Sequence, residues 1–194
     1  MMTDEQERVV LVSERDEIVG EARKLEVHRT GQLHRAFSVL VLDDFGRVLL
    51  QRRAAMKYHS PGLWSNTCCG HPRPGEQTVD AAGRRLREEM GISCDLVPVR
   101  KFVYRAYLGH GLVEHEVDHV FVGRTTQAPH PDGSEVEAWR WLDTDELRVW
   151  LQLRPENFTA WFPEVFASLF SLQETSITLV NRAIPQPQDG LALS

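Results

Sequence analysis

Cysteine is scarce in this sequence of 194 residues, which contains Cys68, Cys69 and Cys94 and no others. An odd number of cysteines, in a chain whose first residues do not resemble a secretory signal, argues against a framework of structural disulfides. A disulfide between the adjacent Cys68 and Cys69 would also be strained. Three cysteines are too few for a four-cysteine zinc site. We therefore expect reduced thiols.

Long apolar runs and an excess of basic residues are missing as well. No apolar run reaches the roughly 20 residues of a transmembrane helix, and the opening MMTDEQERVV is acidic where a secretory signal is basic and then apolar. The formal net charge of −6 gives no general attraction to nucleic acid or anionic membranes. We expect a cytoplasmic monomer or weak homodimer without nucleic-acid or membrane partners, which binds any anionic ligand in a local basic pocket.

What is present is the composition of a globular protein, with 42% hydrophobic and 26% charged residues. The length suits one domain with a core of its own, and we assign residues 1–174 to it. Residues 175–194, which contain IPQPQDG, have the composition of a weakly ordered tail.

Short β-rich runs alternate with polar turn sequences along much of the chain. They predict two hairpins, the second with its turn at DDFG, and three further strands. The hairpins are expected over 7–22 and 36–53, and the strands over 94–108, 113–122 and 135–142.

Three segments have the composition of helices. A run rich in Ala, Arg, Leu and Glu predicts a helix over 78–90 with Gly91 as its C-cap. Further helices are expected over 143–153, capped by its first or second residue, and over 159–173. This order of strands and helices indicates an α+β fold or a mixed-sheet sandwich, and not a pure βαβ repeat.

One segment carries a recognisable motif. Residues 70–92 read GHPRPGEQTVDAAGRRLREEMGI, which resembles the Nudix signature G-x5-E-x7-R-E-U-x-E-E-x-G-U at every fixed position except one. Arg85 stands where the family has its first helical glutamate, which in Nudix hydrolases helps to hold the divalent metals that activate water. Residues 85, 88 and 89 lie three or four apart and share one helical face. The departure at Arg85 argues against hydrolysis.

The flanking sequence narrows the resemblance. The blocks VHRTGQLHRAFSVLVL, LLQRRAAMKYHSPGLWSNTCCGHPRPGE, FVYRAYL, LVEHEVDHVF and AWFPEVF together resemble type I isopentenyl-diphosphate isomerase, over roughly residues 9 to 170. The resemblance implies the Nudix fold, an α/β/α sandwich with a mixed sheet. It also implies interconversion of isopentenyl and dimethylallyl diphosphate in isoprenoid biosynthesis, without flavin.

The resemblance assigns five side chains to a site for one Mn²⁺ or Zn²⁺ ion. Alternation along the strand over 113–122 puts two of them, Glu114 and Glu116, on one face about 7 Å apart and turns His115 away. Taken singly, each histidine is more often an ordinary core or surface residue, and it is their place within these motifs that indicates a site. The five residues are His28, His34, His71, Glu114 and Glu116.

The resemblance also implies the catalytic residues. Cys69 and Glu116 match the two proton-handling residues on opposite faces of the substrate, Tyr104 is expected to hydrogen-bond Glu116, and Trp161 to face a carbocation. Cys69 lies two residues before His71 and faces the same side in an extended loop, whereas Cys68 faces away. A thiol whose surroundings bring its pKa near neutrality can give or accept a proton. Cys68 and Cys94 are interpreted as small buried apolar residues.

The substrate's diphosphate requires cations. The resemblance assigns its binding to Lys24, Arg53, Lys57 and Arg85, and a bridging Mg²⁺ to Glu89 and the backbone carbonyl of Cys69. In this interpretation Arg85 replaces a metal-binding acid, so the site holds the diphosphate instead of cleaving it. Glu76 and Glu88 are expected to form structural ion pairs.

Two other functions are compatible with a Nudix-like sequence. A hydrolase of a nucleoside or other diphosphate would need a second acidic cluster on the helix and no thiol, so Arg85 and Cys69 oppose it. A silent binding module for an isoprenoid diphosphate would have degraded catalytic positions, and none of Cys69, Glu116, Tyr104 or Trp161 departs from the pattern.

Overall fold

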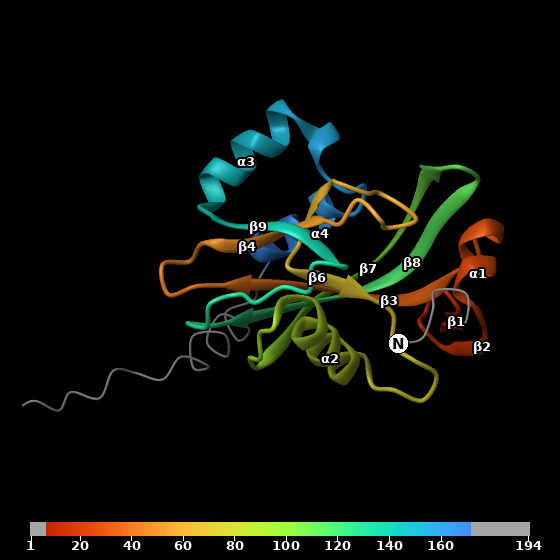
Figure 1. Cartoon of the computed structure of the whole chain (residues 1–194). Helices are drawn as coiled ribbons and strands as arrows, with labels where there is room; N and C mark the ends of the chain where they lie inside the picture. Colours follow the sequence, from red (N-terminus) through yellow and green to blue (C-terminus); the bar gives the residue numbers. More distant parts are fainter. Residues whose placement is uncertain (1–6, 172–194) are drawn as a thin grey trace, which may run out of the picture.

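The computed structural model describes residues 7–171 (Figure 1). The predicted tail over 175–194 lies outside the described residues. The elements, in chain order, are β1 (Arg8–Val12), β2 (Ile18–Arg23), α1 (Lys24–Thr30), β3 (His34–Leu42), β4 (Val48–Arg53), β5 (Trp64–Ser65), β6 (Cys68–Gly70), α2 (Thr78–Met90), β7 (Leu96–Gly109), β8 (Leu112–Arg124), β9 (Val136–Leu142), α3 (Thr144–Leu153), the 3₁₀ turn η1 (Pro155–Asn157), α4 (Phe162–Ala167) and the 3₁₀ turn η2 (Ser168–Ser171).

Strand β3 is the centre of a mixed sheet. It pairs in parallel with β8 and antiparallel with β6 and β1, while β7 pairs antiparallel with β8. The parallel register places His34 of β3 opposite Glu116 of β8. Since side chains alternate between the two faces of a strand, this register sets which side chains of the two strands share a face.

Helices cover both faces of the sheet (Figure 1). One apolar layer joins alternate residues of β3, such as Phe37 and Val39, to Leu86 and Met90 of α2. The other joins the opposite face, including Leu40, to residues of α3 and α4. The predicted α/β/α sandwich with a mixed sheet is therefore confirmed.

Two predicted helices match the structure closely. Helix α2 has the predicted bounds, and Gly91 ends it in the left-handed region with φ of 67°, its N–H bonded to the carbonyl of Arg87. A Cβ at Gly91 would also lie 2.7 Å from the carbonyl oxygen of His130, so both conformation and space require glycine. The cap of α3 is Asp143, whose carboxylate accepts from the N–H of Asp145.

Two predictions need correction. The segment over 36–53 turns as expected, but β3 and β4 pair only at Leu42 and Val48, because beyond this point β6 pairs with β3 and β5 pairs with β4. A single helix over 159–173 is wrong: α4 spans only Phe162–Ala167 and the chain continues as a 3₁₀ turn, with the end of the predicted range outside the described residues. The N–H of Thr159 bonds to the carbonyl oxygen of Trp64, and this bond keeps the first residues of the predicted range out of the helix.

One α-helix and two strands were not predicted, namely α1, β5 and β6, and neither was the 3₁₀ turn η1. Helix α1 carries Lys24 and His28, and β6 carries Cys69. None of the helices within the described part of the chain has the length and apolar character that a membrane span requires.

Candidate active site

A cavity of about 660 Å³ lies where β3, β6, β7 and β8 meet the start of α1 and one face of α2, a size suited to a small-molecule ligand. It is lined by all the predicted catalytic and cationic side chains and by the glutamate predicted to hold Mg²⁺. These are Cys69, Glu116, Tyr104 and Trp161, together with Lys24, Arg53, Lys57, Arg85 and Glu89.

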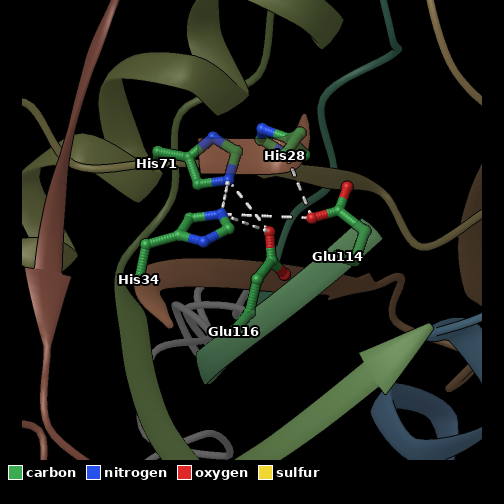
Figure 2. Close-up of side chains that lie close together, drawn as sticks. All are labelled: His28, His34, His71, Glu114 and Glu116. Carbon is green, nitrogen blue, oxygen red and sulfur yellow. Dashed lines mark hydrogen bonds and ion pairs between the residues drawn. The ribbon is translucent and has the colours of Figure 1, made fainter. Parts of the chain in front are cut away.

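Five buried side chains gather at one end of this cavity, and each offers one ligand atom within 4.8 Å of the others. Figure 2 shows Glu114 and Glu116 pointing from β8 towards the three imidazoles. His28 comes from α1, His34 from β3 and His71 from the residue after β6. The five residues predicted as a metal site are thus brought together.

The second nitrogen of two of these histidines is held by the backbone. Nδ1 of His28 lies 2.7 Å from the carbonyl oxygen of Lys24, and Nδ1 of His34 lies 2.9 Å from that of Gln32. A proton on each Nδ1 leaves Nε2 as a free lone pair directed at the cluster, which is the arrangement of metal-binding histidines.

Contacts within the cluster leave a position for a cation. His28 Nε2 and Glu114 Oε2 lie 3.1 Å apart, both buried and without a hydrogen-bond partner. His34 Nε2 lies 3.2 Å from His71 Nε2, which lies 2.9 Å from Glu116 Oε1. Lone pairs and carboxylates that converge in this way repel one another unless a proton or cation lies between them. Nitrogen and oxygen donors in this number suit a divalent ion, so the cluster could hold one.

Burial favours the ligand forms of the imidazoles. It lowers the pKa of His71 to about 4, although the hydrogen bond with Glu116 opposes it. Burial likewise lowers the pKa of His28. Both rings are therefore neutral at neutral pH. Burial and the neighbouring Glu116 raise the pKa of Glu114. Burial opposes ionisation of Glu116 as well, but its contacts with the imidazoles of His34 and His71 lower its pKa.

The thiol of Cys69 faces the cavity, and its sulfur lies 3.9 Å from Nη1 of Arg53. Burial raises its pKa to about 12, and the nearby Arg53 only partly opposes this. Desolvation outweighs the neighbouring cation, so the thiol is protonated at neutral pH. Cys68 is fully buried against α2, as alternation predicts, while Cys94 is only partly buried.

Two aromatic side chains complete this part of the cavity. Tyr104 on β7 pairs with Glu116 across the strands, and its hydroxyl donates to Oε2 at 2.5 Å, the hydrogen bond expected from the sequence. Trp161 is 3% exposed and its Nε1 donates to Asn66 Oδ1 at 3.1 Å, which fixes the indole ring. The guanidinium of Arg53 lies 5.6 Å from the centre of that ring.

The other predicted cations are paired with carboxylates. Lys24 Nζ lies 2.7 Å from Glu7 Oε2, and Lys57 forms a close pair with Glu135. Arg85 contacts three carboxylates, at 2.5 Å (Glu89), 2.9 Å (Glu88) and 3.2 Å (Glu135). Although burial opposes it, these carboxylates raise the pKa of Arg85.

The two glutamates expected in structural ion pairs form them. Glu76 accepts from both Nε and Nη2 of Arg84, at 2.7 and 2.9 Å, and Glu88 pairs with Arg84 and Arg85. Glu89 accepts from Gln51 Nε2 at 2.9 Å in addition to Arg85, and it is buried beside the cavity.

Sequence reasoning missed several side chains in the cavity wall. His59 lies 3.6 Å from Glu114 Oε1 and packs near Trp161, and Glu135 joins two of the cations. Glu7 pairs with Lys24. His59 lies between β4 and β5, where no strand or helix pattern marks it, and Glu135 is the first residue of the predicted strand over 135–142 but lies just before β9.

Comparison with known proteins shows the family of the chain. The NUDIX domain family matches residues 32–162. An Isopentenyl-diphosphate Delta-isomerase 2 of Aromatoleum aromaticum is 53% identical over 156 residues, which cover 80% of this chain and 82% of that protein. An Isopentenyl-diphosphate Delta-isomerase of Burkholderia multivorans is 53% identical over 157 residues, 81% of this chain and 89% of that protein.

The chain belongs to the isopentenyl-diphosphate Delta-isomerase family. Among solved structures, a protein from Deinococcus radiodurans has a TM-score of 0.64 at 20% identity, covering 92% of this chain and all of that one. A MutT NUDIX hydrolase from Burkholderia pseudomallei has a TM-score of 0.57 at 22% identity, covering 71% of this chain and 98% of that one. These structures support the Nudix fold, on which this isomerase family member carries a histidine and glutamate cluster beside a thiol.

Proposed function

We propose that this protein interconverts isopentenyl diphosphate and dimethylallyl diphosphate in isoprenoid biosynthesis, and that the 660 Å³ cavity is its active site. The observation that carries the proposal is that Cys69, Glu116 and Trp161 all line this one cavity. Family membership supports the same reaction, because the relatives at 53% identity are named for it.

The reaction moves one proton along an allylic unit. Protonation of the terminal carbon of the isopentenyl double bond gives a tertiary carbocation, and loss of a proton from the carbon on its other side gives the dimethylallyl isomer. The overall formula does not change. Cys69 and Glu116 would each handle one of these protons, on opposite faces of the substrate, and Tyr104 would orient Glu116 through its hydrogen bond.

Trp161 would stabilise the intermediate. The face of an indole attracts a cation by about 0.5 to 2 kcal/mol when both are desolvated, and it has no such attraction for the neutral alkene. An interaction that exists only with the carbocation favours the chemical step over ground-state binding. The hydrogen bond from Trp161 to Asn66 would hold the ring in place.

The cations in the cavity would bind the diphosphate. Lys24, Arg53, Lys57 and Arg85 all line it, and the planar guanidinium groups suit paired phosphate oxygens. Glu89, with the backbone carbonyl of Cys69, would hold a Mg²⁺ ion that neutralises part of the diphosphate charge.

The histidine and glutamate cluster would hold one Mn²⁺ or Zn²⁺ ion, with no flavin in the reaction. Such an ion supplies positive charge that fixes and polarises the glutamates beside it. Glu116 would then keep its orientation while one of its oxygens contacts the substrate. We expect the enzyme to act in the cytoplasm as one domain over 1–174, as a monomer or weak homodimer, without nucleic-acid or membrane partners.

Deuterium incorporation tests this function. Purified protein with Mg²⁺ and isopentenyl diphosphate in D₂O should place deuterium in the carbon skeleton and form dimethylallyl diphosphate without added flavin or nicotinamide. Release of inorganic phosphate without deuterium in the carbon skeleton would identify a diphosphate hydrolase instead. Arg85 opposes that alternative, because its guanidinium occupies the acidic face of α2 and pairs with Glu88 and Glu89.

A further inference from the structure

Glu135 has no role in the reaction described above, yet it lines the cavity beside two of its cations. Its Oε2 pairs with Lys57 and its Oε1 lies 3.2 Å from Nη2 of Arg85. One carboxylate thus offers one oxygen to each cation, as two oxygens of a phosphate group would.

The backbone holds Glu135 in this position. Its N–H bonds to the carbonyl of Asp132 at 3.0 Å, and its own carbonyl accepts from the N–H of Ala54 at 3.0 Å. Asp132 is in turn bonded through its N–H to the carbonyl of Glu89 in α2. The carboxylate is therefore fixed between the residues that follow β4 and the end of α2.

The two cations differ in how much they depend on Glu135. Arg85 also contacts Glu88 and Glu89. Lys57, within residues 7–171, forms an ion pair with Glu135 alone. Burial opposes ionisation of Glu135, but Lys57 and then Arg85 lower its pKa, so the group is an anion at neutral pH. A diphosphate that binds to Lys57 and Arg85 must therefore displace or share the carboxylate of Glu135.

We propose that Glu135 is a specificity-determining residue that competes with the substrate's diphosphate for Lys57 and Arg85. The inference rests on the proposed function, because it needs these cations to bind a diphosphate. A ligand with several negative charges gains more from them than the single carboxylate does, whereas a ligand of low charge gains little. Glu135 also weakens binding of substrate and product alike, which limits ground-state binding without affecting the barrier of the chemical step.

Inorganic pyrophosphate is the probe, titrated by calorimetry at fixed Mg²⁺ concentration and ionic strength. Glu135→Gln keeps the shape of the side chain and removes its charge, and it should bind pyrophosphate about tenfold more tightly, about 1.4 kcal/mol. The KM for isopentenyl diphosphate should fall in parallel, without an increase in kcat. Glu135→Ala provides a second variant, and thermal unfolding checks that each remains folded.

Glu137→Gln is the matched control, because it removes the same charge two residues away, from a glutamate paired with Arg52 on the exposed surface. It should change pyrophosphate affinity less than twofold, which separates a local effect from a change in net charge. In a Lys57→Gln background the effect of Glu135→Gln should shrink, because the contested cation is gone.

The outcomes are distinct. Equal or weaker pyrophosphate binding in both Glu135 variants would overturn the inference and identify Glu135 as a residue that only positions the two cations. A wild-type protein that binds no pyrophosphate would overturn the proposed diphosphate site and the competition with it. Tighter binding in the Glu135 variants, with the Glu137 control unchanged, supports the inference.

Discussion

Tyr104 and Glu116 face each other across strands β7 and β8, and the tyrosine hydroxyl donates a hydrogen bond of 2.5 Å to the carboxylate. The other oxygen of Glu116 lies 2.9 Å from His71 Nε2. Glu116 is therefore held by one group on each oxygen, and this single side chain connects the histidine and glutamate cluster to Tyr104 in the wall of the cavity.

This relationship gives the first prediction, for Tyr104→Phe. Loss of the hydroxyl frees one oxygen of Glu116, and kcat should fall by about 10²-fold with little change in KM, because orientation and not substrate binding is lost. Tyr107→Phe is the control, since that tyrosine is on the same strand and 78% exposed. Steady-state kinetics of both variants would contradict the proposed orienting role if Tyr104→Phe behaved like Tyr107→Phe.

The second prediction concerns the two proton-handling residues. Cys69→Ala and Glu116→Gln should each reduce turnover by about 10³-fold or more, because each removes one of the two proton transfers, while circular dichroism remains native. Cys94→Ala removes a thiol that does not line the cavity and should keep normal turnover. A Cys69→Ala enzyme with near-normal rates would make that thiol structural.

The third prediction concerns the metal. The wild-type protein should retain about one transition-metal ion per chain after dialysis, and His28→Ala or His71→Ala should lose it, because each removes one of five converging donors. His115→Ala is the control, since its Nδ1 contacts the carbonyl of Gly31 and its side chain points away from the cluster. Elemental analysis gives the measurement. Full activity in a metal-free wild-type protein would refute the site.

The fourth prediction concerns stability and pH. The hydrogen bond from Arg84 lowers the pKa of Glu76 below its ordinary value of 4.5, and the N–H of Arg73 adds to this effect against partial burial. The folded state therefore gains stability from this carboxylate above about pH 4.5 and loses it as the pH falls through the lower folded-state pKa. Glu76→Gln should lower the free energy of unfolding by about 1 kcal/mol at neutral pH, and by less at about pH 3.

Urea unfolding at both pH values measures this difference. Glu137→Gln, which disrupts an exposed pair with Arg52, should change the free energy of unfolding by less than about 0.5 kcal/mol at either pH. An equal effect of Glu76→Gln at both pH values would show that the ionised carboxylate is not the stabilising group.

The parts of the site that the sequence predicted are those fixed by local geometry or by a motif. Alternation along one strand was enough to place Glu114 and Glu116 on one face, and the end of α2 at Gly91 followed from the glycine itself. The prediction that His28, His34 and His71 lie together depended on family resemblance, because their spacing along the chain does not show that three separate segments come together.

Other features needed the folded structure. His59 reaches the cavity from an irregular segment, where no periodic pattern indicates the direction of a side chain, and Glu135 reaches it from the edge of a predicted strand, where the alternation of side chains begins. The high pKa of Cys69 also could not be derived from the sequence, because it arises from burial by residues distant along the chain. Likewise, the short α4 reflects tertiary contacts that override a helix-like composition.

The pairing of His34 with Glu116 depends on the frame in which β3 and β8 align. Removing or adding a single amino acid in β8 just after Glu116 would move the two glutamates out of step with the rest of the strand and with β3, and a one-position slip turns their side chains to the opposite face. Every functional side chain would still be encoded, yet the donors could no longer converge. Variants with such an insertion or deletion should fold but lack activity. Function therefore requires the register of the two strands as well as the functional residues.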